Sequence, residues 1–78
     1  MAFMNKSSLT KRIGRAIRSR REARRVSQEA FADEIQMHRT YYGAIERGEK
    51  NLQITTLQRV CAGLETEIWE VIKDAEHL

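Results

Sequence analysis

Residues 38–48 read HRTYYGAIERG, and this stretch carries hydrogen-bonding side chains at the spacing of one short helix. Tyr42 and Ile45 are three positions apart, so both should point into a core. The opposite side then presents polar and small groups, namely His38, Arg39, Thr40, Tyr41, Gly43 and Ala44. Such a surface can approach another molecule closely and form hydrogen bonds with it.

The chemistry of these side chains matches the edges of DNA bases. A guanidinium such as that of Arg39 can donate two hydrogen bonds to O6 and N7 of guanine, worth roughly 1–3 kcal/mol of discrimination. Thr40 can bond a base edge or contact a thymine methyl group, and Tyr41 offers both a ring and a hydroxyl. We therefore expect this helix to face the major groove of double-stranded DNA.

The elements that position these residues are all predicted to be helices, because apolar residues recur at helical spacing and no segment alternates long enough for a strand. The first helix should begin at Ser7 or Ser8 and end near residues 24–25. Ser27 is the predicted N-cap of a second helix that ends near residues 36–37.

Three more helices complete the prediction. The third begins at residues 37–38 and stops at Gly48, since glycine readily adopts the left-handed conformation common at helix ends. The fourth begins at residues 55–56, and the fifth follows an N-cap at Thr66. Two short helices joined by a tight turn, over residues 27–36 and 38–47, form a helix-turn-helix.

The charge distribution favours an anionic partner at one end of the molecule. The 78-residue chain has a formal net charge of +3, but residues 1–25 hold nine basic side chains and one acidic one. Residues 65–78 hold five acidic side chains and one lysine. A polyanion would be attracted to the first region and repelled by the second, although a solvated helix face would also account for the basic residues.

Several other classes of protein find little support. No serine, cysteine or carboxylate pair has a matching base, and there is no glycine-rich phosphate loop, so we expect no enzyme and no cofactor. His38, Cys61 and His77 do not supply the four ligands of a zinc site. The chain lacks a membrane-spanning run and the apolar core of a signal peptide, and its single cysteine cannot form an internal disulfide. We expect a cytoplasmic protein, associated with the nucleoid through DNA.

The segment VSQEAFADEIQMHRTYYGAIERGEKNLQITTLQRVCAGL resembles the Cro/CI-type (Xre) helix-turn-helix regulators of bacteria and phages. The resemblance covers about residues 9–72, and residues 1–78 would form a single domain. It implies an all-α, compact five-helix, lambda-repressor-like fold that binds an inverted-repeat operator as a homodimer. A repressor or autoregulator is the expected function.

Residue roles follow from the resemblance together with the outward face described above. The base-reading positions would be Arg39, Thr40, Ala44 and Gly43. Contacts to the DNA backbone would come from Ser27, Gln28, His38, Tyr41, Arg47, Lys50 and Asn51. Gln28 would also brace the third helix, and Arg21 and Glu46 would form a partly buried ion pair between the first and third helices.

Departures from the family pattern raise further expectations. Arg25 stands where glycine is usual at the end of the first helix, which would put a non-glycine residue in a left-handed conformation, and Glu65 replaces another common glycine. Trp69 stands where a small polar residue is usual; it either covers the core or, with Glu65 and Ile72, forms a dimer interface.

The resemblance leaves the biological role open. Stand-alone regulators and controller proteins of restriction–modification systems are the most similar members. In a controller, the acidic last helix could also contact RNA polymerase. The alternative is an antitoxin that binds DNA and neutralises a partner toxin.

Overall fold

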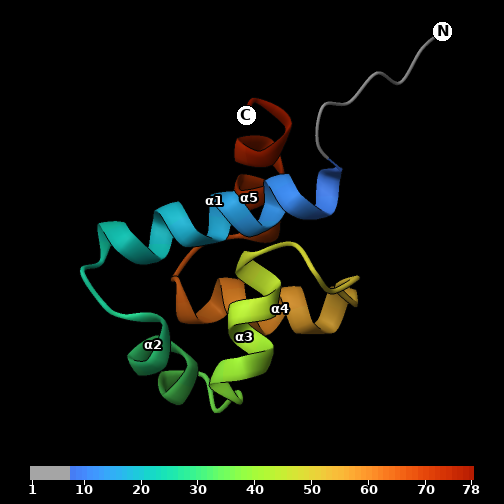
Figure 1. Ribbon diagram of the computed structural model, residues 1–78. Helices are drawn as coiled ribbons and strands as arrows, with labels where there is room; N and C mark the ends of the chain where they lie inside the picture. Colours follow the sequence, from blue (N-terminus) through green and yellow to red (C-terminus); the bar gives the residue numbers. More distant parts are fainter. Residues whose placement is uncertain (1–7) are drawn as a thin grey trace, which may run out of the picture.

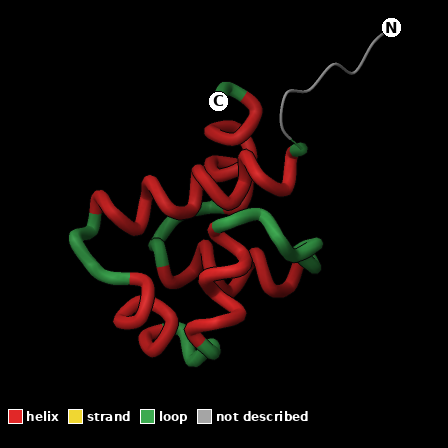
Figure 2. Tube along the Cα trace, viewed as in Figure 1, coloured by secondary structure: helices red, strands yellow, loops and turns green. Residues whose placement is uncertain are grey.

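The structure, a computed structural model, describes residues 8–78, and Figure 1 shows their arrangement. The helices, in chain order, are α1 (Leu9–Ala23), α2 (Gln28–Glu34), α3 (Arg39–Glu46), α4 (Ile54–Gly63) and α5 (Ile68–Glu76). Figure 2 shows that helices and connecting loops make up this whole part of the chain. The expected all-α, five-helix fold is confirmed. Two residues of the sequence predictions, Lys6 of the basic N-terminal region and the alternative cap Ser7, lie outside the described residues.

The helix starts show which capping predictions were correct. The hydroxyl of Ser8 accepts a hydrogen bond from the amide of Lys11 at 3.2 Å, and that of Ser27 accepts from Ala30 at 3.0 Å. The predicted cap of α5 at Thr66 was wrong, because Glu67 is the N-cap and pairs with Glu70 in a capping box. The carboxylate of Glu70, three residues inside the helix, accepts from the amide of Glu67 at 2.9 Å and from the hydroxyl of Thr66 at 2.6 Å, so Thr66 supports the capping box from outside the helix.

The start of α4 also differs from its prediction by one or two residues. The helix begins at Ile54 after the N-cap Gln53, which makes no side-chain capping bond. Helix boundaries are poorly marked in a sequence when no capping side chain is used.

All five helices contribute side chains to the core, in which α1 packs against both α3 and α5, α2 packs against α3, and α4 packs against α5. Its largest fully buried side chains include Tyr42, Phe31 and Ile17, and the rings of Phe31 and Tyr42 have centroids 5.2 Å apart. The helical spacing of the last segment also predicts Ile68 and Ile72 in the core, but both are only half-buried against it. Within residues 8–78, no helix is long and apolar enough to cross a membrane.

Several arginines join helices through hydrogen bonds to backbone carbonyls, although their side chains remain exposed. Arg24 donates to the carbonyl of Gly63 at 2.8 Å, and Arg59 donates to the carbonyls of Ile35 and Gln36, each at 2.8 Å. These bonds satisfy carbonyl groups that helix ends leave without partners. Part of the positive charge seen in the sequence therefore joins helices to one another at the surface.

Three helix ends place a residue other than glycine in the left-handed region. The φ angles are 62° at Arg25, 57° at Gln36 and 58° at Glu65, and only Gly48, at 72°, has the residue type suited to it. Arg25 confirms the expectation from the sequence, and Glu65, which also replaces a common glycine, has the same conformation, whereas Gln36, in the turn of the helix-turn-helix, was not anticipated. A side chain in this conformation costs on the order of 1 kcal/mol.

Arg25→Gly should therefore raise the free energy of unfolding by about 0.5–1 kcal/mol, after allowing for the greater freedom of glycine in the unfolded chain. Urea denaturation at neutral pH measures this change. Arg25→Ala is the matched control, since it removes the exposed side chain but keeps the β-carbon, and it should give no gain. Equal stabilisation by both substitutions would attribute the effect to charge instead.

Candidate nucleic-acid interface

The centre of the helix-turn-helix is a buried carboxylate, that of Glu46 at the end of α3. Its Oε2 accepts hydrogen bonds from Nε of Arg21 at 2.7 Å and from the hydroxyl of Tyr42 at 2.5 Å. Its Oε1 accepts from Nη2 of Arg21 at 3.0 Å and from Nε2 of Gln28 at 2.8 Å. The Arg21–Glu46 ion pair is thus present, and Gln28 braces α3 as expected.

The local sequence explains how this cluster forms. Tyr42 and Glu46 are four residues apart, so they lie on the same side of α3. Gly14 lets α1 come close, because a β-carbon there would lie 2.5 Å from the carbonyl oxygen of Glu46. The side chain of Arg21 can then reach the carboxylate, and the side chains of Arg21 and Glu46 are only 8% and 1% exposed.

The electrostatics keep this cluster charged. Burial alone would raise the pKa of Glu46, but the hydrogen bonds from Arg21, Tyr42 and Gln28 outweigh it and lower that pKa below its usual value. Burial, and then the hydrogen bond to the ionised Glu46, raise the pKa of Tyr42. The hydrogen bond to Glu46 likewise raises the pKa of Arg21. At neutral pH, a carboxylate and a guanidinium therefore face each other with a neutral phenol beside them.

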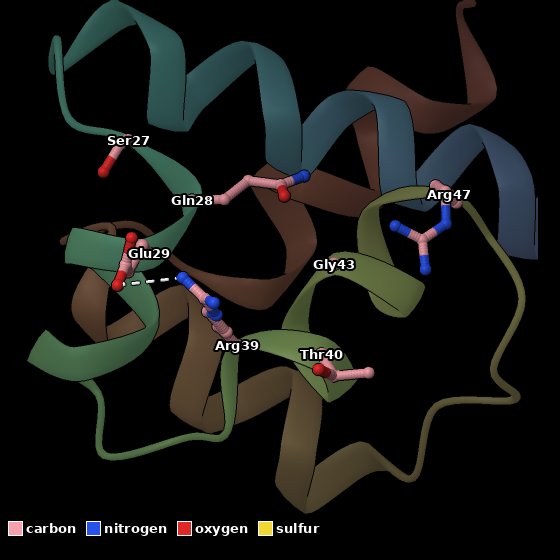
Figure 3. Close-up of a pocket in the computed structure, with 7 residues that line it drawn as sticks. All are labelled: Ser27, Gln28, Glu29, Arg39, Thr40, Gly43 and Arg47. Carbon is pink, nitrogen blue, oxygen red and sulfur yellow. Dashed lines mark ion pairs between the residues drawn. The ribbon is translucent and has the colours of Figure 1, made fainter.

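The candidate DNA-contacting residues gather around one hollow of about 480 Å³ between the starts of α2 and α3 (Figure 3). Six of its seven lining residues were predicted from the sequence as DNA contacts, namely Ser27, Gln28, Arg39, Thr40, Gly43 and Arg47. Glu29 completes the lining, and its Oε2 lies 2.9 Å from Nη1 of Arg39. The structure thus joins residues from both helices into one surface.

Only the first turn of α3 is available to a partner. Residues 39–41 are exposed, whereas residues 42–46 are buried. The prediction that Ala44 reads bases from an outward face was wrong, because Ala44 is only 6% exposed. After α3 the chain turns at Gly48, and the amide of Glu49 donates to the carbonyl of Ala44 at 2.9 Å, a backbone bond that closes the end of the helix.

Gly43 is also buried, although it lines the hollow. A β-carbon at this position would lie 3.1 Å from Nη1 of Arg47 and 3.5 Å from Oε1 of Gln28. The lack of a side chain therefore makes room for these two residues, which favours a packing role over direct contact with a base.

The other predicted backbone contacts surround the hollow. His38 is the N-cap of α3, and its Nδ1 accepts from the amide of Thr40 at 3.2 Å. Tyr41 is 37% exposed, and Nζ of Lys50 lies 5.8 Å from its ring centroid. Arg47 pairs with Glu49 at 3.0 Å, and Asn51 is exposed in the loop that follows. Arg47, Lys50 and Asn51 extend the surface beyond the C-terminal end of α3, whereas His38 and Tyr41 belong to its start.

Reading the sequence missed a second hollow, of about 290 Å³, beside the first. Three basic residues of α1, Lys11, Arg15 and Arg18, line it together with Gln28, Glu46 and Arg47. The spacing of the three on α1, four and then three residues apart, is the signal that could have placed them on one face. Because Gln28 and Arg47 belong to both hollows, the basic face of α1 continues the surface formed by α2 and α3.

Comparisons with known proteins agree with this geometry. Residues 17–68 match the helix-turn-helix family. The chain is 40% identical over 57 residues to control protein C.MunI from a Mycoplasma species, an alignment that covers 73% of this chain and 77% of that protein. The fold resembles ClgR, a clp gene regulator from Corynebacterium glutamicum, with a TM-score of 0.87, 26% identity, and coverage of 92% and 94% of the two chains.

A third similar structure is the restriction–modification controller protein C.Esp1396I, solved as a tetramer with its natural 35 base-pair operator. The TM-score is 0.78 and the identity 31%, over 91% of this chain and 99% of that one. The present chain belongs to the helix-turn-helix family. The expected DNA-binding regulator is thereby confirmed.

Tyr42→Phe should lower the free energy of unfolding by about 1.5–3 kcal/mol at pH 7, since it removes a hydrogen bond to a charged group. The folded state depresses the pKa of Glu46, so this carboxylate stabilises the fold above its unfolded pKa and ceases to do so as pH falls through its folded pKa. The difference between the variant and the natural protein should therefore shrink in acid.

Denaturation in urea at a series of pH values measures this difference. Tyr41→Phe is the control, because Tyr41 is the exposed neighbour and its hydroxyl makes no hydrogen bond within residues 8–78. A penalty for Tyr42→Phe that stays constant down to pH 2 would contradict the assigned role of the ionised carboxylate.

Proposed function

We propose that the protein is a transcription regulator that reads an inverted-repeat operator as a homodimer, in the manner of a restriction–modification controller. One observation carries this proposal. The exposed first turn of α3 presents Arg39 and Thr40, and the buried Glu46 cluster fixes this helix against α1 and α2. Residues at the start of a recognition helix are the ones that reach base edges in the major groove.

The residues divide into two roles. Arg39 and Thr40 read bases, and the groups around them hold the phosphates on either side. The phosphate contacts come from the predicted set, Ser27, Gln28, His38, Tyr41, Arg47, Lys50 and Asn51, together with Lys11, Arg15 and Arg18 of α1. These basic residues supply an attraction that depends on salt and not on sequence.

The dimer surface lies around Trp69 at the start of α5. This indole is 62% exposed, which argues against a role in covering the core. Beside it is a hollow lined in part by Cys61, Ala62 and Ile68. A two-fold contact would place Trp69 of each copy against the hollow of the other, with Glu65 and Ile72 at its margin.

The relatives favour a controller over an antitoxin, because C.MunI is a control protein and C.Esp1396I is a restriction–modification controller protein. Binding at an operator blocks polymerase without any further surface, so repression or autoregulation is the expected effect. Activation by contact between the acidic α5 and RNA polymerase is the second mode of a controller. Such a protein would act on DNA in the bacterial cytoplasm.

Selection of bound duplexes from a randomised pool tests the function directly. Purified protein at near-physiological salt should enrich an inverted repeat whose half-sites are about one helical turn, ~34 Å, apart. Binding without any enriched sequence, and lost as salt rises, would mean that the basic surface acts only as charge.

Arg39→Ala should lose discrimination at one base pair in each half-site, by roughly 1–3 kcal/mol, while preferences at the other positions remain. Titration of duplexes that differ at single positions measures this loss. Arg15→Ala is the matched control: it should weaken binding to all duplexes equally and reduce the slope of log K against log salt by about 1. The same uniform pattern for Arg39→Ala would reassign Arg39 to phosphate contact.

Trp69→Ala should shift the dimer towards monomer, because it removes a large aromatic anchor from the proposed interface. Sedimentation velocity over a range of protein concentrations measures the shift, and circular dichroism checks that the fold is retained. Ile54→Ala is the control, because Ile54 is an exposed apolar residue at the N-terminal end of α4, and it should leave the dimer unchanged. A dimer that persists in Trp69→Ala would place the interface elsewhere.

A further inference from the structure

Glu29 is the one acidic residue that lines the hollow between the starts of α2 and α3. Figure 3 shows its carboxylate facing the guanidinium of Arg39 across this hollow, and Oε2 of Glu29 lies 2.9 Å from Nη1 of Arg39. The two side chains are 64% and 63% exposed, so they form a pair on the surface that would meet DNA. The pair joins the first turn of α2 to the first turn of α3.

A carboxylate at this position has few partners on DNA. It can only accept hydrogen bonds when ionised, and phosphate oxygens can only accept as well. The phosphates also repel its charge. Glu29 is therefore tolerated beside DNA only while a cation or another donor stays next to it, and Arg39 is the cation that the structure puts there.

The guanidinium of Arg39 can serve Glu29 and a base together. It has five N–H donors in a planar fork, and only Nη1 is close to Glu29. Its remaining donors can reach O6 and N7 of guanine. On a sequence without guanine at that position, Arg39 can turn towards a phosphate instead, and Glu29 is then left facing the polyanion alone.

We propose that Glu29 is a specificity-determining residue that acts through Arg39. It keeps the guanidinium directed at the base, and it weakens binding in complexes in which Arg39 turns away from Glu29 towards a phosphate. This inference rests on the proposed function, because it requires Arg39 to read a base. The pair does not hold the fold together, since ion pairs between exposed side chains contribute little to stability.

Glu29→Gln tests the inference because it keeps the size of the side chain and removes its charge. The substituted protein should bind non-operator duplexes more tightly, and its preference for the operator over a duplex altered only at the Arg39 base pair should fall about tenfold. Competition binding with the selected operator, the singly altered duplex and an unrelated duplex gives both quantities. Thermal unfolding should be unchanged.

Glu22→Gln is the matched control, since Glu22 is an exposed acid of α1 that pairs with Arg18 at 3.1 Å and lines neither hollow. It changes the net charge by the same amount and should preserve the preference. If Glu29→Gln strengthened binding to every duplex by the same factor as Glu22→Gln, the effect would be one of net charge alone and the inference would be overturned.

The double variant Arg39→Ala with Glu29→Gln separates a positioning role from direct reading. Without Arg39, removal of the Glu29 charge should strengthen binding to all duplexes alike. A change in preference at another base pair in this background would show that Glu29 itself reads a base, which contradicts the inference. A natural protein that shows no preference among duplexes would instead contradict the proposed function.

Discussion

The buried Glu46 carboxylate joins three helices at one point. α3 carries it, α1 supplies Arg21 and α2 supplies Gln28, while Tyr42 binds it from within α3. A charge removed from water is costly unless its lone pairs are satisfied, and here four hydrogen bonds satisfy both oxygens. Any change in the angles between these helices would break some of those bonds, so the cluster specifies one arrangement.

This arrangement matters because the DNA-facing surface is a direct continuation of the cluster. Gln28 donates to Glu46 and also lines the two hollows on either side of it. Arg39 and Thr40 stand at the opposite end of α3 from Glu46, on a helix of only eight residues. A short helix fixed at its C-terminal end and enclosed over residues 42–46 holds its first turn in place before any partner arrives. Less ordering is then required on binding.

Features set by spacing within one helix could be predicted from the sequence, whereas contacts between separate elements could not. The five helices, the helix-turn-helix and the inward side of α3 followed from periodicity, which reports a helix face averaged over several turns. The role of Ala44 did not, because Ala44 is buried in the folded chain, and a helical pattern does not show how wide the buried side of a helix is. The pair of Glu29 and Arg39 was missed for the same reason: their proximity depends on the turn between two helices, not on the spacing within one.

The fold determines which basic residues of α1 can meet DNA and which contact the rest of the protein. Arg20 pairs with Asp74 of α5 at 2.8 Å, and Arg12 donates to the carbonyl of Ala75 at 3.2 Å, so these two charges are used against the last helix. Arg15 and Lys11 instead line the hollow beside Gln28. One side of α1 thus holds the acidic helix, and the other continues the surface formed by α2 and α3. The basic and acidic ends of the sequence therefore lie on different sides of the molecule, with α5 across α1 from the surface that would meet DNA.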